Sequence, residues 1–299
     1  MATATTSTST AYFTTDAGFR TMGSAIGTAI TSVNLIKTSD TGQINWTTVL
    51  HPTTQSTVSG YEVYRFNDYL QSTSPVYIKI EYGCGSYAVG YMGLWITVGT
   101  GTDGAGNLTG NISQRVAIAS SAIDTNTRTS YFSGDVNRLC FVLWPQNPAN
   151  MSSQWLVFGI ERSHNASGVD TGTAAHIFWS SATSPFGSCQ YLLLGTTTNF
   201  ITPYVSQGWY CSIPPSGGGS LSPNLYSYPI KSYNMYETLP IFNFVHFAGT
   251  DFATGSTFSI TGYDSVSRTY YVPGMVNTNA GYFAFTGAPL TTALLMRYE

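Results

Sequence analysis

Apolar and polar residues alternate in two segments of the stretch from Pro75 to Gly110, which reads PVYIKIEYGCGSYAVGYMGLWITVGTGTDGAGNLTG. Residues 76–82 show this period of two, and residues 94–98 repeat it after a glycine-rich connection. Such alternation, with β-branched and aromatic side chains, predicts two paired strands. The second strand continues into Gly99, Gly101, Gly104, Gly106 and Gly110. Because glycine adopts backbone angles that other residues resist, we expect a β-hairpin that ends in a glycine-shaped loop.

Segments of similar character recur along the rest of the chain, with turn-forming residues between them. They cover residues 43–49, 60–68, 116–120, 137–145, 154–162, 176–181, 190–196, 241–249, 258–263, 268–274, 282–285 and 292–299. Strands separated by turns, without alternating helices, favour a sandwich or barrel over a parallel βαβ sheet. The predicted fold is therefore all-β, an antiparallel and jelly-roll-like β-sandwich with one N-terminal amphipathic helix.

That helix is predicted within residues 16–37, where apolar residues recur every three or four positions. Phe19, Met22 and Ile26 belong to this apolar face, and Asp16 is placed to cap the first turn. Gly23 and Gly27 lie four residues apart and lower helix stability. We expect them to mark tight packing on a sheet, with a dimer seam as the alternative.

Two segments bear on how the chain is divided. Residues 1–15 form a Ser/Thr/Ala tract, which predicts a disordered tail or an arm ordered by a neighbouring subunit. Residues 1–40 are thus an N-terminal arm and helix, and residues 41–299 are the β-sandwich region. Residues 211–224, CSIPPSGGGSLSPN, predict either a hinge between two domains or a long surface loop.

Charge is scarce. Only 8% of the 299 residues are charged, against roughly 25% in an ordinary soluble domain, whereas 14% are aromatic and 21 are Tyr. Protein interfaces are rich in Tyr and Trp and poor in Lys and Glu. The composition therefore predicts a subunit that neighbours cover extensively. A net charge of −3 without a basic stripe argues against nucleic-acid binding.

Neither membrane insertion nor export is expected. No apolar run approaches the ~20 residues that span a bilayer, and residues 1–15 lack the basic and apolar regions of a signal peptide. Cys84, Cys140, Cys189 and Cys211 are widely spaced and lie in or beside apolar segments. We interpret them as buried free thiols, with disulfides as the alternative.

No catalytic residue, metal site or cofactor is predicted. The histidines are isolated from one another, no GxSxG motif occurs, and no spacing pairs two carboxylates. The glycine loop lacks the Gly-Lys-Ser/Thr sequence of a phosphate cradle. A calcium site at Asp103 and Asn107 would rest on a single carboxylate, which is thin ligation for that ion.

An aromatic cluster occupies the Pro/Gly/Ser-rich region that follows residue 200. It comprises Tyr204, Trp209, Tyr210, Tyr226, Tyr228, Tyr233 and Tyr236. Exposed aromatic side chains are typical of sugar-binding and protein-binding surfaces. Core packing or subunit contact explains the same residues equally well.

Between Asp16 and Gly110 the chain contains, in this order, DAGFRTMGSAI, TGQINW, GYEVYRFND, PVYIKIEYGCG and GLWITVGTGTDGAGNLTG. With RFND and VGTGTDGAGNLTG as its most specific pieces, this part of the chain resembles structural proteins of tailed bacteriophages and prophages. The close of the chain, LLMRYE, is similar to the ending of such proteins. The resemblance implies a virion protein of the tail, baseplate or neck without enzymatic residues, assembled in the cytoplasm of a host bacterium.

This resemblance leads to a hypothesis of a non-enzymatic, homo-oligomeric virion subunit whose partners are its own copies and other virion proteins. Its candidate subunit contacts are Phe19, Met22, Ile26, Gly99, Gly101, Asp103, Gly104, Gly106 and Asn107, together with the N-terminal arm. Two alternatives are a receptor-binding module, whose aromatic cluster contacts host surface glycan, and a capsid decoration protein. A depolymerase that hydrolyses host polysaccharide is the enzymatic alternative.

Overall fold

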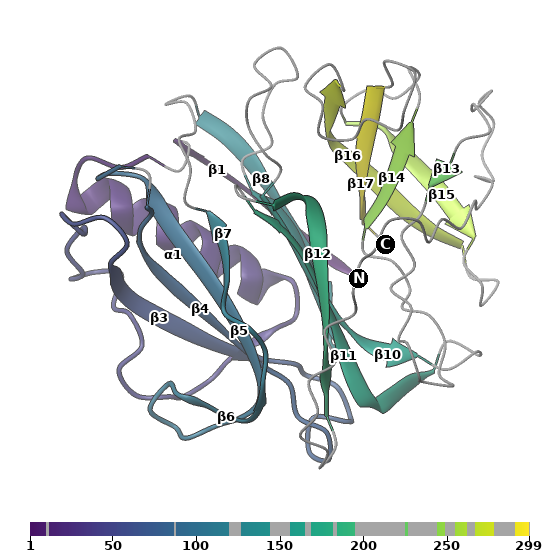
Figure 1. Ribbon diagram of the computed structural model, residues 1–299, viewed down its shortest axis with the longest axis horizontal. Helices are drawn as coiled ribbons and strands as arrows, with labels where there is room; N and C mark the ends of the chain where they lie inside the picture. Colours follow the sequence, from purple (N-terminus) through teal and green to yellow (C-terminus); the bar gives the residue numbers. More distant parts are fainter. Residues whose placement is uncertain are drawn as a thin grey trace.

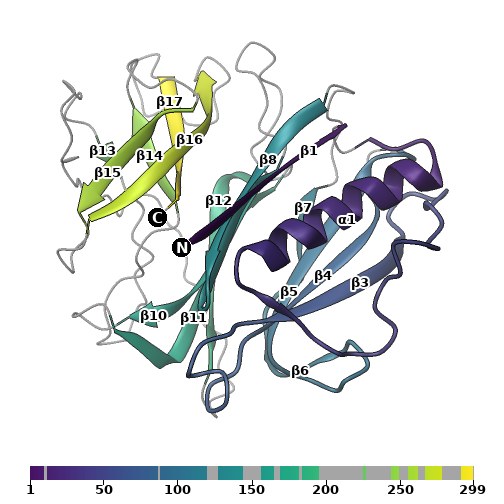
Figure 2. The same ribbon diagram turned by 180° about the vertical axis from the view of Figure 1, so that it is seen from behind.

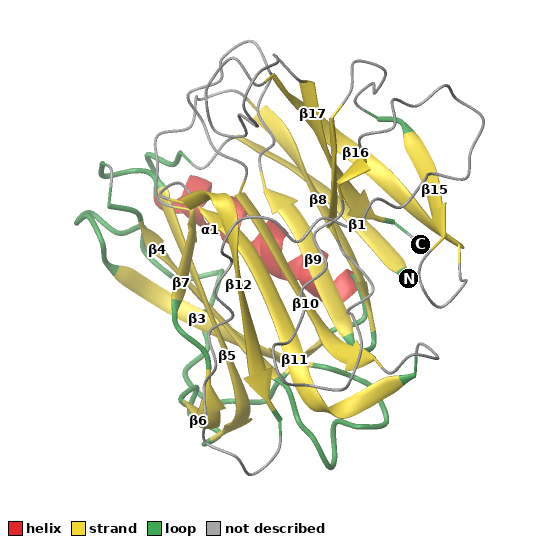
Figure 3. Ribbon diagram, turned by 45° about the vertical axis from the view of Figure 1, so that its right-hand side comes forward, coloured by secondary structure: helices red, strands yellow, loops and turns green. Residues whose placement is uncertain are grey.

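A computed structural model describes residues 1–9, 12–86, 88–119, 127–143, 156–164, 169–181, 184–194, 225–226, 244–248, 255–261, 267–277 and 291–298. Within these residues the chain consists of antiparallel strands, turns and one helix (Figures 1 and 3). The predicted all-β sandwich with a single N-terminal helix is confirmed.

The described strands form three sheets, which we name by their order in the structure. The N-terminal sheet has the order β2-β3-β4-β5-β6, with β7 also on β5: β2 Ile36–Lys37, β3 Val58–Arg65, β4 Tyr77–Cys84, β5 Met92–Thr102, β6 Leu108–Ile112 and β7 Val116–Ala119. The central sheet has the order β1-β8-β9-β10-β11-β12: β1 Ala2–Ser9, β8 Thr127–Asp135, β9 Arg138–Leu143, β10 Leu156–His164, β11 Asp170–Ser181 and β12 Ser184–Leu193. The C-terminal sheet has the order β13-β14-β17-β16-β15: β13 Leu225–Tyr226, β14 Phe244–Ala248, β15 Thr257–Thr261, β16 Ser267–Asn277 and β17 Thr291–Arg297.

Strand order follows chain order through most of the N-terminal and central sheets, so both are largely meanders. β1 is the exception, because it joins the central sheet beside β8. A jelly roll instead passes between sheets in Greek-key steps. Within the described residues, these two sheets are therefore built mainly from strands that follow one another in the chain.

The helix, α1, spans Asp16–Ser32. Its N-cap is Thr15, whose side chain accepts a hydrogen bond from the Gly18 amide at 3.1 Å. The predicted cap, Asp16, instead lies in the first helical turn and accepts a hydrogen bond from the His51 amide at 2.8 Å. The prediction of Asp16 as the cap was wrong by one residue, because Thr15 keeps the extended backbone that capping requires.

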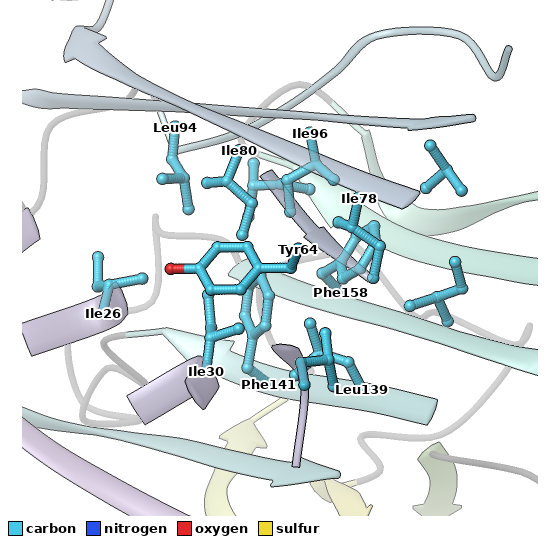
Figure 4. Packing of buried hydrophobic residues seen from close by; sticks show 14 of the residues in the cluster. Ile26, Ile30, Tyr64, Ile78, Ile80, Leu94, Ile96, Leu139, Phe141 and Phe158 are labelled. Atoms are coloured by element: carbon cyan, nitrogen blue, oxygen red, sulfur yellow. The ribbon is translucent and has the colours of Figure 1, made fainter. Parts of the chain in front are cut away.

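The main core lies between the N-terminal and central sheets, and α1 runs beside β1 along one side of it (Figures 2 and 4). Alternation places every second side chain of each strand on this inner face. The cluster includes Ile26 and Ile30 of α1, Tyr64, Ile78, Ile80, Leu94 and Ile96 of the N-terminal sheet, and Leu139, Phe141 and Phe158 of the central sheet. All of these side chains are buried, so burial of apolar area from both sheets is the main stabilising contribution here.

Gly23 and Gly27 let α1 approach the N-terminal sheet closely. A Cβ atom on Gly23 would lie 1.9 Å from the Trp46 ring, and one on Gly27 would lie 2.6 Å from Glu62 Oε2. Both distances are shorter than any van der Waals contact. The prediction of tight packing is confirmed for both glycines, on the N-terminal sheet at Gly27 and on the Trp46 ring of the preceding turn at Gly23.

We expect Gly23→Ala to lower the free energy of unfolding by about 1–3 kcal/mol, because the added methyl group overpacks the contact with Trp46. Gly18→Ala is the matched control on the same helix, since its Cβ would meet its nearest neighbour at 3.4 Å. That change should be neutral or stabilise by up to ~1 kcal/mol through helix propensity. Urea unfolding of both variants is the measurement, and equal effects would contradict this packing.

The second face of the central sheet packs against the C-terminal sheet. Met296 of β17 joins Cys140, Val142 and Val157 in a small buried cluster. The Tyr131 and Tyr271 rings lie 5.1 Å apart at the same contact. Burial, with a contribution from Tyr271, raises the pKa of Tyr131 to about 12. The central sheet is thus the middle of three layers.

Cys84 and Cys140 are buried free thiols, as predicted for them. The side chain of Cys189 and all of Cys211 lie outside the described residues. So do residues 211–224, the proposed hinge or loop, and the predicted strand at 282–285.

Two sequence predictions were wrong about local structure. Residues 43–49 are not a strand, because the Asn45 side chain accepts hydrogen bonds from the amide and hydroxyl of Thr47 and closes a turn. The tract at residues 1–15 is not a disordered tail over its described part, because β1 pairs with β8 along its full length and Phe13 is buried. β1 is ordered by its own chain and needs no neighbouring subunit for this.

Candidate interaction surface

The glycine-rich loop follows the predicted hairpin of β4 and β5 and joins β5 to β6 as the turn of a second hairpin. Gly99 and Gly101 lie within β5, opposite Ile112 and Thr109 of β6. Gly104, Gly106 and Gly110 have φ angles of 77°, 83° and 75°, where a side chain is strained. The glycines therefore shape this hairpin within the chain.

Asp103 closes the tip of the loop. Its carboxylate accepts hydrogen bonds from the Ala105 amide at 2.8 Å, the Asn107 amide at 3.0 Å and the Asn107 side chain at 2.7 Å. The bond from the Asn107 side chain is the largest of the effects that lower the pKa of Asp103. Three N–H donors surround this carboxylate, so it accepts the hydrogen bonds that close the turn. A calcium ligand would instead lie among other oxygen atoms.

Asp40 and Tyr61 hold the same loop from a neighbouring part of the chain. The hydroxyl of Tyr61 lies 2.7 Å from the Thr41 carbonyl and 2.8 Å from the Ala105 carbonyl. Asp40 accepts hydrogen bonds from the Thr102 hydroxyl and from the Gly106 amide, the latter at 3.0 Å. A Cβ on Gly106 would lie 2.1 Å from the Tyr61 ring. The close approach that Gly106 permits is thus made within the chain.

Asp40 makes the loop sensitive to acid. Burial raises the pKa of Asp40, but hydrogen bonds from Thr102, Thr38 and Gly106 outweigh it, so the net pKa lies below the usual range. A carboxyl with a depressed pKa stabilises the fold above the pKa of the unfolded chain, near ~4, and this stability is lost as the pH falls through the folded pKa.

Replacing Asp40 by Asn should therefore destabilise the protein by about 1–2 kcal/mol at pH 7 and by less at pH 3. Urea unfolding at both pH values measures the difference. Amide hydrogen exchange should also accelerate at Gly106, while the amide of Val98, which donates to Ser113 Oγ at 2.8 Å, provides a reference. A cost that does not change with pH would contradict this role of Asp40.

The outer face of the N-terminal sheet carries charged and aromatic side chains that pair with one another. Lys79 Nζ lies 4.5 Å from the centre of the Tyr61 ring, and the Arg115 guanidinium lies 4.6 Å from that of Trp95. Arg115 also forms an ion pair with Glu81. The charged groups of Lys79, Arg115 and Glu81 on this face therefore already have partners within the chain.

A buried carboxylate, Glu62, connects β2, β3, β4 and Trp46 beside Gly27 of α1, and it was not singled out from the sequence. Its Oε1 accepts from Lys37 Nζ at 2.6 Å and from Trp46 Nε1 at 3.2 Å. Its Oε2 accepts from the hydroxyls of Tyr64 and Tyr82 at 2.7 and 2.8 Å. Both oxygens have partners, so the group acts as a structural acceptor.

Burial first, and the charge of Glu62 second, raise the pKa of Tyr64 well above its ordinary value. Burial is also the main reason that the pKa of Tyr82 is raised. Phenols of the unfolded chain titrate near ~10, so the stability tied to these groups is complete below that pH and decreases above it.

A second buried ion pair joins the two main sheets. Arg162 of β10 binds both carboxylate oxygens of Asp68 and donates to the Ser74 carbonyl at 2.7 Å. Its guanidinium lies 5.3 Å from the centre of the Phe66 ring, and the Asn67 amide donates to the Val136 carbonyl at 2.7 Å. The RFND segment at residues 65–68 therefore attaches the N-terminal sheet to the central sheet.

Ser163 and His176 form a buried hydrogen bond on the second face of the central sheet. Ser163 Oγ lies 3.0 Å from His176 Nε2 and 3.2 Å from the Ala174 carbonyl, and both side chains are buried. The Ser163 hydroxyl donates to the Ala174 carbonyl, and the direction of its bond with His176 is set by the tautomer of the imidazole ring.

The predicted contact residues fall into three groups. Phe19, Met22 and Ile26 are buried in the core of their own chain, so their side chains do not reach the surface. Among the loop residues, Asp103, Gly104 and Asn107 are exposed at the tip, whereas Gly106 is buried. In the aromatic cluster, only the backbone of Tyr226, in β13, is described; its side chain and Tyr204, Trp209, Tyr210, Tyr228, Tyr233 and Tyr236 lie outside the described residues.

Exposed apolar side chains at one end of the sandwich were not predicted. Tyr69 and Val169 are 69% and 52% exposed, and Val136 also reaches solvent. The Tyr69 hydroxyl donates to the Asp170 carbonyl at 3.3 Å, which brings these turns together. The sequence contains no periodic signal for them, because they lie in turns from three separate hairpins or loops.

Comparisons with protein-family models, with curated proteins and with solved structures found no match. In the described part of the chain, no helix has the length and apolar character needed to cross a membrane. Histidine, cysteine and carboxylate side chains do not gather there in groups of three or more that could hold a metal ion.

Proposed function

We propose that this chain is a non-enzymatic structural subunit of a bacteriophage virion, in the tail, baseplate or neck, that acts through contacts with its own copies and with other virion proteins. The supporting observation is its weakly charged surface. Several of the few charges are used within the chain, where Lys37 pairs with Glu62 and Arg162 with Asp68. The Thr3, Thr5 and Ser7 side chains of β1 and the Thr109 side chain of β6 face solvent instead.

A surface of this kind suits stable contact between subunits. Charged side chains oppose association because they must be desolvated or paired, and interfaces are depleted in Lys and Glu. Uncharged strand edges associate through backbone hydrogen bonds, which need no special side chains. The resemblance of residues 16–110 to phage structural proteins supports the virion as the place of assembly.

The two alternatives carry less support. Glycan binding rests on the aromatic cluster, whose side chains are not described. Capsid decoration would use the same kinds of contact at another place in the particle. Binding of the intact oligomer to a glycan array would favour the receptor-binding alternative over a pure scaffold.

Disrupting the gene in its phage or prophage tests the proposal. Particles made without this chain should lack or misassemble one tail, baseplate or neck component in electron micrographs, and the wild-type gene should restore them. Normal infective particles from the disrupted phage would contradict a structural role.

Deleting residues 1–15 is a poor test of arm contacts. The deletion would remove the buried Phe13 and the N-cap Thr15 as well as β1, and so would damage the fold. Substitution of a single exposed residue of β1 separates assembly from folding.

A further inference from the structure

β1 is an edge strand of unusual regularity. It pairs with β8 over all eight residues, from Ala2 opposite Gly134 to Ser9 opposite Thr127, without a register shift. It stands at the end of the central sheet, and no described strand pairs with its other side. Within the described part of the chain, its outer backbone groups have no strand partner, which is the condition for pairing with a further strand.

The sequence features that commonly protect a sheet edge are missing from β1. Sheet edges are commonly blunted by charged residues, proline, bulges or short length. β1 contains none of the first three: residues 2–9 read ATATTSTS. By contrast, β2 has two residues, β6 has a register shift and Gly110 at positive φ, and β12 contains Pro185.

The two faces of β1 differ in chemistry. Ala2 and Ala4 pack against the main core, whereas Thr3, Thr5 and Ser7 are exposed on the opposite face. Ser7 already pairs with Thr129 of β8 through their hydroxyls, at 3.2 Å. The exposed row can make the same type of cross-strand contact on its other side.

We infer that the free edge of β1 binds β1 of a second copy of this chain, antiparallel and across a two-fold axis. The inference rests on the proposed homo-oligomeric function and names its contact. An uncharged strand is self-complementary, since its own copy brings no like charges to face it. A two-fold contact also uses the same surface on both subunits and closes on itself.

Symmetry and alternation restrict the register. Directly opposite residues point to the same face of an antiparallel sheet, so core-facing residues must oppose core-facing residues if both cores lie on one side. Centring the pair on Thr5 meets this condition. Thr5 then faces its own copy, Thr3 faces Ser7, and Ala4 faces Thr6, which joins two central sheets into one continuous sheet.

Charge substitutions at Thr5 test the inference. Thr5→Lys would put two ammonium groups opposite each other on the axis and should weaken dimerisation at least about tenfold, while Thr5→Val, which keeps the β-branched shape, should dimerise like the wild type. An equimolar mixture of Thr5→Lys and Thr5→Glu should restore the dimer. Light scattering and sedimentation velocity measure the masses, and thermal unfolding confirms that each variant folds.

A Thr5→Lys variant that keeps the wild-type mass, or a mixture no better than either component, would overturn the β1 contact while leaving oligomerisation through another surface intact. A wild-type protein that stays monomeric at all concentrations would overturn the β1 contact and the homo-oligomeric part of the proposed function together. If Thr5→Lys chains are incorporated into normal particles, the β1 contact is not needed for assembly, and only the proposed role as a virion subunit is retained.

Discussion

Replacing Arg162 by Met is expected to lower the free energy of unfolding by about 3–5 kcal/mol. The substitution removes the guanidinium and leaves the Asp68 carboxylate buried without its cation; the side-chain exposures of the pair are 0% and 1%. The Ser74 carbonyl also loses a donor. The free energy lost by leaving one buried charge unpaired exceeds the free energy gained by burying the apolar Met side chain, because the remaining carboxylate stays out of water. Urea unfolding measures the loss.

Arg115→Met is the matched control for Arg162→Met. The Arg115 side chain is 46% exposed, so loss of its pair with Glu81 should cost only about 0–1 kcal/mol. Combining Arg162→Met with Asp68→Asn removes the stranded charge and should cost less than the sum of the two single changes. The buried pair would be refuted as the connection between the sheets by either of two results. One is a double variant whose loss of unfolding free energy equals the sum of the two single losses, and the other is an Arg162→Met loss as small as that of Arg115→Met.

The second large effect is expected for Glu62→Leu, which should cost at least about 3 kcal/mol. Leucine leaves the hydroxyls of Tyr64 and Tyr82 and the indole N–H of Trp46 without their shared acceptor. Buried donors that lose a partner each cost about 1–3 kcal/mol. Lys37 loses its counter-charge as well, although its half-exposed ammonium can turn to solvent.

Two variants separate the hydrogen bonds of Glu62 from its burial. Glu62→Gln keeps the shape and one acceptor oxygen, and should cost about 1–2 kcal/mol less than the leucine change. Glu81→Leu makes the same substitution on the outer face of the next strand, where the expected cost is within about 1 kcal/mol. Equal costs for Glu62→Leu and Glu81→Leu in urea unfolding would contradict the network around Glu62.

Local patterning was sufficient to predict the elements whose signal lies within a short window. The hairpin of β4 and β5 follows from strict alternation, and α1 follows from its three-to-four spacing. Both patterns show which side chains of the element a core can bury. The element can therefore be predicted without knowing the surface that it packs against.

Elements defined by distant partners were missed or misassigned. β1 has too little hydrophobicity to predict a strand, and its order comes from β8, more than a hundred residues later, as the Ser7 to Thr129 contact shows. Ile44 and Trp46 alternate as in a strand, yet Asn45 closes a turn there. In both cases tertiary contacts override the local pattern.

The candidate surface was predictable only in part. Glycines at positive φ were expected from the sequence, but their supports, Asp40 and Tyr61, come from another part of the chain. Phe19, Met22 and Ile26 were apolar enough for an interface, and an apolar stripe alone does not say whether the covering surface belongs to the same chain. The structure covers them from within.

Quantitative mass spectrometry of purified particles tests the central claim most directly. If the chain is a structural subunit, its peptides should occur in multiple copies per particle, at a ratio to the major virion proteins that stays constant across preparations and salt washes. Absence from the particles, or an amount that varies between preparations as a contaminant does, would contradict the account.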